Sequence, residues 1–245
     1  MSESFGSVTR HFKRNLNKAL ENALGLRLYR VQAHGHQDWY DIRKSCCRIE
    51  TIFDVGANVG QTAQRLRDAF PKATIYCFEP VRAMFEKLQK SLSGDRHMQF
   101  FQVALGSASG TGKIYLGDHP TTSSLVEPEN PRGFEEVRIE TIDSFCRARG
   151  IERIDLLKVD AEGFDLEVLK GAASMLTSAR VAFALAEVGF HPGDMVHVLF
   201  DHVREFLMPH GFRVYGFYDQ TLEWTGENRL RFANACFANE AAFRK

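Results

Sequence analysis

The chain has 245 residues, of which 44% are hydrophobic and 25% charged, so it can bury a substantial single core without disulfides or a structural metal. The chain has 31 basic residues (lysine plus arginine) and 31 acidic residues (aspartate plus glutamate). This balance excludes an overall positive electrostatic field that would recruit nucleic acid. Five cysteines without CxxC spacing favour a reducing, cytoplasmic location, and no apolar run reaches membrane-spanning length.

Residues 1–45 form an N-terminal segment that we separate from a single domain spanning residues 46–245. Apolar residues recur every four positions from Phe12 to Leu24, which predicts a short amphipathic helix. Residues 1–30 carry six basic and two acidic side chains, a local charge of 6 − 2 = +4. We expect this helix to pack on the domain; peripheral contact with a membrane, or with a second copy of the chain in a homo-oligomer, is the alternative.

A polar aromatic cluster precedes the first predicted strand. It consists of His34, His36, Trp39 and Tyr40. Such rings stack on the face of a sugar, but an ordinary edge of the core is an equal interpretation.

From residue 51 onwards, short apolar runs alternate with helical patterns. The runs are rich in β-branched and aromatic residues, as expected for strands covered on both faces: TIFDV, ATIYCF, MQFFQVAL, IDLLKV and VAFALAEV. Helical patterns lie at about 61–70, 81–92 and 165–177. This alternation predicts an α/β fold with a doubly wound, mostly parallel sheet.

Two regions depart from this alternation. Residues 106–142 hold turn-rich sequence and a long polar loop, with short apolar runs on either side, which predicts an inserted hairpin with a functional loop. Near the C-terminus, FRVYGF and RFANACFA flank a polar stretch and predict an antiparallel strand pair.

The stretch FDVGANVG, residues 53–60, is a glycine turn that follows the first predicted strand. It lacks the middle glycine of the dinucleotide fingerprint, and Asp54 at the strand end would repel a phosphate. An acid here suits a cationic ligand such as S-adenosylmethionine, whose nucleoside would lie against the backbone between Gly56 and Gly60. An NAD-dependent dehydrogenase is therefore a weaker hypothesis.

Glu79 supplies a second part of the same predicted site. It ends the next apolar strand, 25 residues after Asp54, close to the interval at which an acid meets ribose hydroxyls in nucleoside-binding sheets. Its two carboxylate oxygens suit two adjacent hydroxyls. We therefore expect a nucleoside site at this edge of the sheet.

The motifs FDVGANVGQT, CFEP, VALG, TTSSL, VRIETIDSF and LLKVDAEGFDLEVLKGA resemble the FkbM-type methyltransferase family over about residues 50–190. The resemblance implies a class I, Rossmann-like, S-adenosylmethionine-dependent fold and O-methylation of sugar or polyketide hydroxyls. The segments outside the resemblance, about 45 N-terminal and 50 C-terminal residues, are expected to select the substrate. The cofactor contacts that it implies are Asp54, Gly56, Ala57, Asn58, Gly60, Glu79, Pro80, Ala104 and Leu105.

Titratable residues gather where the fourth and fifth predicted strands end, the edge at which open α/β sheets bind ligands. His191 is the candidate general base, because its ordinary pKa lies near neutrality. Asp160, Glu162 and Glu187 are candidates to orient that imidazole, to take the proton or to bind the acceptor, and Asp160 is also a candidate cofactor contact. Lys158 shares a strand face with Asp160, and a buried ion pair is its expected role.

A divalent cation held by the same acids is a rival arrangement. It is not favoured, because no compact ligand motif sets the geometry, and no metal ligands are assigned.

The polar loop supplies candidate substrate contacts. Thr122, Ser123 and Ser124 are expected to close over the cofactor or to donate to the substrate together with His191, although a solvated turn is an equal interpretation.

The leading hypothesis is a cytoplasmic S-adenosylmethionine-dependent O-methyltransferase. Its acceptor would be a hydroxyl of a sugar, a glycolipid or a natural product, so the partner is a small molecule or a glycan- or lipid-linked acceptor. The alternatives are an N-methyltransferase acting on an amine or peptide, and a non-catalytic nucleoside-binding or assembly module.

Overall fold

The computed structural model describes residues 38–45, 47–117, 123–127, 133–194, 196–223 and 228–243, together with Leu20. The predicted helix at residues 12–24 therefore lies, Leu20 aside, outside the described residues, as do His34 and His36. No helix within the described part of the chain is long and apolar enough to cross a membrane.

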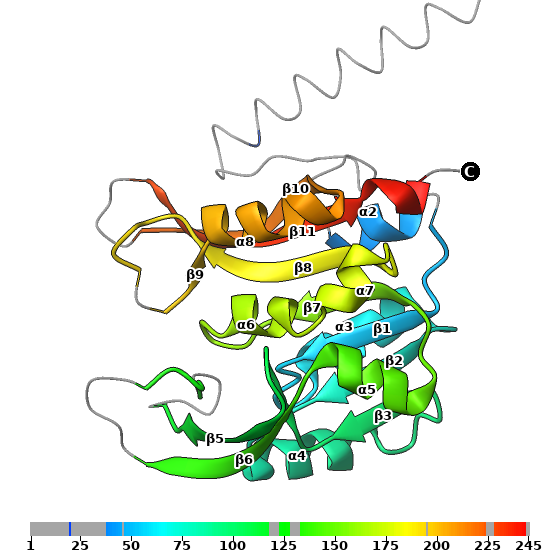
Figure 1. Cartoon of the computed structure of the whole chain (residues 1–245), viewed down its shortest axis with the longest axis vertical. Helices are drawn as coiled ribbons and strands as arrows, with labels where there is room; N and C mark the ends of the chain where they lie inside the picture. The colour runs from blue at the N-terminus through cyan, green and yellow to red at the C-terminus, as the bar shows by residue number, and fades with distance from the viewer. Residues whose placement is uncertain are drawn as a thin grey trace, which may run out of the picture.

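The core of the fold is a twisted sheet in the order β10-β11-β8-β7-β1-β2-β3, with β9 beside β8 (Figure 1). Strands β3, β2, β1, β7 and β8 pair in parallel, whereas β11 and β10 run antiparallel. This arrangement confirms the predicted sheet and its C-terminal strand pair. The strands are β1 (Thr51–Val55), β2 (Thr74–Phe78), β3 (Met98–Phe101), β7 (Ile154–Val159), β8 (Val181–Gly189), β9 (Val198–Leu199), β10 (Phe212–Leu222) and β11 (Leu230–Asn239).

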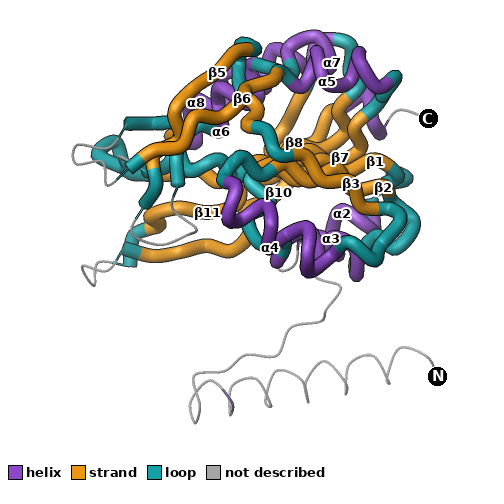
Figure 2. The backbone as a smooth tube through the Cα atoms, turned by 90° about the horizontal axis from the view of Figure 1, so that it is seen from below, coloured by secondary structure: helices purple, strands orange, loops and turns teal. Residues whose placement is uncertain are grey.

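Helices cover both faces of this sheet (Figure 2). One face carries α2 (Asp38–Lys44), α3 (Gln61–Ala69) and α4 (Arg82–Leu92). The other carries α5 (Ile142–Arg149), α6 (Asp165–Lys170), α7 (Ala173–Thr177) and α8 (Phe200–Leu207), while the 3₁₀ turns η1 (Met208–His210) and η2 (Glu240–Phe243) flank the C-terminal strands. All six residues of β7 are buried, as a strand covered on both faces requires.

The helices differ from the sequence prediction in two respects. The predicted helix at 165–177 is two helices, because the chain breaks at Gly171, where a Cβ would lie 2.1 Å from the carbonyl oxygen of Gly106. Helices α5 and α8 were not predicted. In α5, the Thr141 side chain accepts from the backbone N–H of Ser144 at 3.0 Å, and Gly150 ends the helix at φ 64°.

The region 106–142 contains the predicted hairpin. Strands β5 (Gly110–Tyr115) and β6 (Phe134–Glu140) pair antiparallel, and β4 (Ala104–Leu105) joins β6 to make a small second sheet. The run MQFFQVAL, expected as one strand, is thus divided between the two sheets. This second sheet lies at the carboxyl ends of the parallel strands (Figure 1).

Helix α2 packs against the domain that follows it. Ile42 is fully buried in the core, and the buried Asp41 carboxylate accepts a hydrogen bond from the Tyr218 hydroxyl at 3.0 Å. Trp39 is partly buried and packs against the same core. The boundary between residues 45 and 46 stays a prediction.

We expect Phe145→Ala to lower the free energy of unfolding by about 3–5 kcal/mol, the cost of emptying a large aromatic site in a core. Phe145 is fully buried, and its ring centroid lies 4.8 Å from those of both Phe78 and Phe101. Urea unfolding measures the change. The control, Phe134→Ala, alters a ring that is 49% exposed and should cost less than about 1 kcal/mol; equal costs would contradict this account of the core.

Candidate functional site

The glycine turn after β1 brings the backbone at the end of β1 into contact with the backbone at the end of β7. Gly56 has φ 74°, and a Cβ there would lie 1.8 Å from the carbonyl oxygen of Asp160, which follows β7. The N–H groups of Gly56 and Ala57 both donate to the carbonyl of Phe78 at 3.0 Å. Only glycine permits this approach, so the turn fixes the ends of β1, β2 and β7 relative to one another.

Asn58 and Gly60 complete the turn and start α3. Asn58 has φ 49°, and Gly60, at φ 97°, is the residue before the first helical turn. A Cβ on Gly60 would lie 2.7 Å from Leu92 in α4, so this glycine serves helix packing and does not line the cavity described below.

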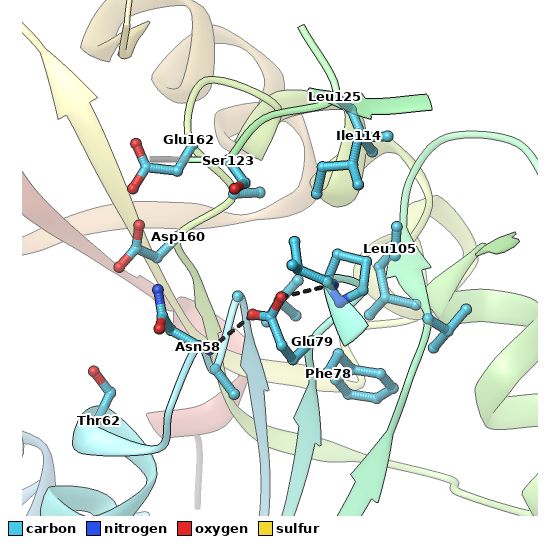
Figure 3. A pocket seen from close by; sticks show the side chains of 18 of the residues that line it. Asn58, Thr62, Phe78, Glu79, Leu105, Ile114, Ser123, Leu125, Asp160 and Glu162 are labelled. Atoms are coloured by element: carbon cyan, nitrogen blue, oxygen red, sulfur yellow. Dashed lines mark hydrogen bonds between the residues drawn. The ribbon is translucent and has the colours of Figure 1, made fainter. Parts of the chain in front are cut away.

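Glu79 fastens the turn to the end of β2. One carboxylate oxygen accepts from the backbone N–H of Asn58 and the other from that of Val81, both at 2.8 Å (Figure 3). Burial raises the pKa of this carboxyl from 4.5 to about 7, against the lowering effect of the two N–H donors. The carboxylate is therefore held rigidly, with lone pairs left for a ligand.

A cavity opens beside Glu79 and divides into two chemically different ends (Figure 3). Phe78, Leu105, Ile114 and Leu125 form an apolar end, whereas Asn58, Thr62, Asp160 and Glu162 form a polar one. Seven of the predicted cofactor contacts line this cavity besides Glu79: Gly56, Ala57, Asn58, Pro80, Ala104, Leu105 and Asp160. Glu162 lines it as well.

Asp54 lies elsewhere than expected, in the core behind the cavity wall. It is fully buried, and strand alternation turns its side chain toward Lys158, its partner in the β1–β7 register. Lys158 Nζ lies 3.4 Å from Asp54 Oδ1 and 3.1 Å from Asp160 Oδ2. The predicted ion pair of Lys158 is thus confirmed, and the expected contact of Asp54 with a ligand is corrected to a charge that balances this lysine.

Burial alone would lower the pKa of Lys158, but the carboxylates of Asp160 and Asp54 outweigh it and raise that pKa above its ordinary value. The lysine therefore stays charged, and it holds one oxygen of Asp160 in a fixed position.

His191 is not among the residues that line the cavity. It is exposed on a turn after β8, and its Nδ1 accepts from the backbone N–H of Gly193 at 2.9 Å. The expected pairing of Glu187 with His191 is replaced by another histidine: His197 Nε2 lies 3.3 Å from Glu187, and its Nδ1 lies 2.8 Å from Asp194. Sequence reasoning missed His197 because it did not anticipate that β9, which follows His197 directly, pairs with β8.

Hydrogen bonds to Glu187 and Asp194 outweigh burial and raise the pKa of His197 to about 9. The imidazole is therefore charged near neutrality and stacks on Phe232 with 4.5 Å between ring centroids. A signal was present in the sequence, since Asp194 three residues before His197 forms a local turn by accepting from the N–H groups of Val196 and His197.

The polar loop contacts the site through two of its predicted residues. Ser123 lines the cavity (Figure 3). Ser124 instead anchors the loop, because its hydroxyl donates to the carbonyl of Glu162 at 2.5 Å while its backbone pairs with Tyr115. Thr122 lies outside the described residues.

Glu162 and Asp165 are acids that the fold crowds together after β7. Burial, reinforced by the charge of Asp160, raises the pKa of Glu162 to about 8 and that of Asp165 to about 7. Glu162 also adopts φ 49°, an uncommon conformation for a residue with a side chain. Over the described ranges, no three His, Cys, Asp or Glu side chains are grouped to hold a metal ion.

The model of the Methyltransferase FkbM domain matches residues 54–214. The chain belongs to the FkbM methyltransferase family. Its sheet is mostly parallel and has an antiparallel C-terminal strand pair, as predicted.

Curated relatives match the FkbM part of the chain. A 2-O-methyltransferase, NoeI, from Sinorhizobium fredii is 28% identical over 54% of this chain and 61% of its own length. A hexuronic acid methyltransferase, AglP, from Haloferax volcanii is 25% identical over 61% of each chain. Each match thus spans about three fifths of the relative.

A solved precorrin-6y C5,15-methyltransferase from Geobacter metallireducens is 11% identical, with a TM-score of 0.43 over 81% of this chain and 84% of that one. A likeness at that level says nothing about the acceptor.

The cavity fits the cofactor of the FkbM family. Glu79 offers carboxylate oxygens to ribose hydroxyls, the apolar end suits an adenine ring, and Asn58 and Asp160 offer polar groups to an amino acid moiety. The turn at Gly56 would let a ligand approach the backbone closely. Sequence reasoning missed Ile114 and Leu125, since only the folded hairpin brings the second sheet over the cavity.

We expect Gly56→Ala to lower the free energy of unfolding by more than about 2 kcal/mol and to weaken S-adenosylhomocysteine binding by more than about tenfold, because the new Cβ would overlap the Asp160 carbonyl. Urea unfolding and calorimetric titration measure both effects. Gly94→Ala is the matched control, since a Cβ there meets nothing within 4 Å. A Gly56 variant that behaves like the Gly94 variant would show that the turn tolerates a side chain.

Proposed function

We propose that this protein transfers a methyl group from S-adenosylmethionine to a hydroxyl of a sugar-type acceptor. One observation carries the proposal: the cavity of this FkbM-family chain contains a rigid, buried carboxylate, Glu79. This carboxylate lies between the apolar end of the cavity and the polar residue Asp160. The sugar-type acceptor is supported by the printed names of two relatives, a 2-O-methyltransferase and a hexuronic acid methyltransferase.

S-adenosylmethionine supplies a methyl group bonded to a positively charged sulfur. The protein's own task is to bind the nucleoside and to place an acceptor oxygen in line with that methyl group. Glu79 and the apolar residues Phe78 and Leu105 would hold the nucleoside. Excluding water from the cavity falls to Ile114 and Leu125 of the second sheet.

Asp160 is the residue best placed to orient the acceptor. Its side chain is 36% exposed, and Lys158 fixes Oδ2, which leaves Oδ1 to accept a hydrogen bond from a hydroxyl. A hydroxyl that donates to a carboxylate has its oxygen lone pairs directed away from that carboxylate, and its proton has a place to go. Asp160 therefore takes the role that the sequence assigned first to His191.

We expect S-adenosylhomocysteine to bind more tightly as the pH rises from about 6 to about 8. Burial raises the pKa of Glu79 to about 7 in the free protein, and ribose hydroxyls donating to the carboxylate favour its charged form. Below this value Glu79 carries a proton that binding must release, so affinity falls as the pH drops through it. Calorimetric titration across this range measures the dependence.

The variant Glu79→Gln tests whether the pH dependence comes from Glu79 rather than from other titrating groups near the site, such as Glu162 and Asp165. The variant should bind roughly tenfold more weakly and with a flat pH profile over the same range. A profile that keeps the wild-type slope in the Gln variant would assign the proton to another group. Circular dichroism checks that the variant is folded, because the Gln amide nitrogen cannot accept from a backbone N–H.

We expect Asp160→Asn to lower the rate of methyl transfer by at least about 100-fold, a larger loss than the variant causes in S-adenosylhomocysteine affinity. The assay measures radiolabelled methyl transfer to hydroxylated and amine acceptors, and fragmentation mass spectrometry distinguishes ethers from methylamines. Asp201→Asn, on the exposed surface of α8, is the control and should match wild type. Binding of the cofactor product without transfer to any hydroxylated acceptor, or transfer to amines alone, would overturn the proposed reaction.

A further inference from the structure

A second, polar hollow adjoins the cofactor cavity on the face of the sheet that carries α2 and α3. We call it the acceptor groove and define it by Asp38, Trp39, Arg65, Asp160, Asp219 and Asn234. Thr62 and Asp160 line both the groove and the cofactor cavity. The two hollows therefore meet at one wall, and Asp160 is part of it.

We propose that the acceptor groove binds a neutral, polyhydroxylated sugar ring and disfavours an anionic one such as a uronic acid. This inference rests on the proposed function and specifies its acceptor. The ring would lie between α2 and the C-terminal strand pair, with the hydroxyl to be methylated at Asp160.

The groove offers several hydrogen-bonding groups at fixed positions. Asn234 Nδ2 donates to Asp219 Oδ2 at 3.0 Å, which leaves the second oxygen of Asp219 and the amide oxygen of Asn234 as acceptors. Asp219 has φ 47° and lies at an irregularity in the β10–β11 register between Tyr218 and Thr221. Such irregularities re-aim side chains, and here Asp219 lines the groove. Paired acceptors of this kind suit vicinal hydroxyls.

An aromatic surface completes the recognition of a sugar. Trp39 lines the groove from α2, next to Asp38. Tyr40 also lines it, but Lys44 Nζ lies 4.7 Å from the centroid of its ring and Arg43 lies 5.8 Å from it. Trp39 is thus the ring better suited to cover the apolar face of a sugar.

The charges of the groove set the preference between neutral and anionic rings. Asp38, Asp160 and Asp219 contribute three acids, against Arg65 and Lys158. Lys158 is shared between Asp160 and the buried Asp54, so the three acids of the groove and Asp54 outnumber the two cations, Arg65 and Lys158.

Asp38 lies in the same negative field. Burial is the main cause that raises the pKa of Asp38 to about 6, and the charge of Asp219 adds to the shift, while the Trp39 N–H and Arg65 oppose it. A carboxylate on the acceptor would enter this field at a cost, whereas hydroxyls would be bound by it.

The position of the groove relative to the family match supports a role in substrate choice. Asp38, Trp39, Asp219 and Asn234 lie outside residues 54–214, whereas Asp160 and the cofactor cavity described above lie largely within them. The part of the chain that the family model matches thus holds the cofactor, and the flanking parts form the outer side of the acceptor groove.

Saturation-transfer NMR with methyl glycosides tests this inference, using protein with and without S-adenosylhomocysteine. The probes are methyl glucoside, galactoside, mannoside, rhamnoside and fucoside, each neutral, with methyl glucuronide and galacturonide as the matched acids. We expect at least one neutral glycoside to bind, and to bind more strongly than either acid. Binding by the acids in preference, or by none of the neutral rings to folded protein, would overturn the inference.

Variants assign the binding to the groove. Asp219→Asn should weaken the neutral glycoside by roughly 2- to 12-fold, the range for one hydrogen bond, and Asp219→Lys should shift the preference toward the glucuronide. Asp201→Asn on α8, which lies on the opposite face of the sheet, should change nothing. Neutral-sugar binding that is indifferent to both Asp219 variants would place the acceptor elsewhere.

Calorimetry with S-adenosylhomocysteine separates the two proposals. Failure of this ligand to bind counts against the proposed function alone, since the glycoside measurement is also made on the free protein. Cofactor binding with no neutral-sugar binding counts against the groove alone.

Discussion

One buried cation, Lys158, organises the centre of this molecule. It is 5% exposed, and a charged ammonium in that position is stable only because Asp54 and Asp160 lie beside it. Asp54 belongs to β1 and lies opposite Lys158 in the strand register, so the ion pair joins the two central strands. Removing Asp54 would leave a buried charge short of a partner, which typically costs about 3–5 kcal/mol. The same lysine positions Asp160, and the carbonyl of Asp160 in turn packs on Gly56.

Structural and ligand-binding roles are therefore carried by the same residues. Glu79 uses both carboxylate oxygens to tie Asn58 and Val81 together, and those oxygens also face the cavity. A ligand bound there meets a carboxylate that is already oriented, so little side-chain entropy is lost on binding. The corresponding disadvantage is that substitutions at Glu79 disturb the turn as well as the ligand contact. Stability and affinity must be measured together at such positions.

The sequence allowed the sheet, its C-terminal strand pair and most of the cofactor cavity to be predicted, because each depends on local patterns: apolar runs, a glycine turn and an acid at a strand end. It did not reveal which way Asp54 points: the predicted run TIFDV matches β1 residue for residue, but the run alone does not say which side of the sheet faces the cavity. It also favoured His191 over His197. His191 follows the end of β8 closely in the sequence, but only the folded chain shows that His197 lies beside Glu187 of β8. Residues such as Asn234 and Asp219 come together only through the pairing of β10 and β11.

The cofactor cavity and the acceptor groove differ in polarity because different segments of the chain build them. The inserted second sheet closes the cofactor cavity with apolar side chains, and the Ser124 hydroxyl fastens its loop to the carbonyl of Glu162. The acceptor groove instead takes its outer side from α2 and the C-terminal strands, where Asp41 and Tyr218 hold those elements together. Of the described residues that line the two hollows, only Thr62 and Asp160 are shared. Under the proposed function, changes in the flanking segments would therefore alter the acceptor groove while leaving most cofactor contacts in place.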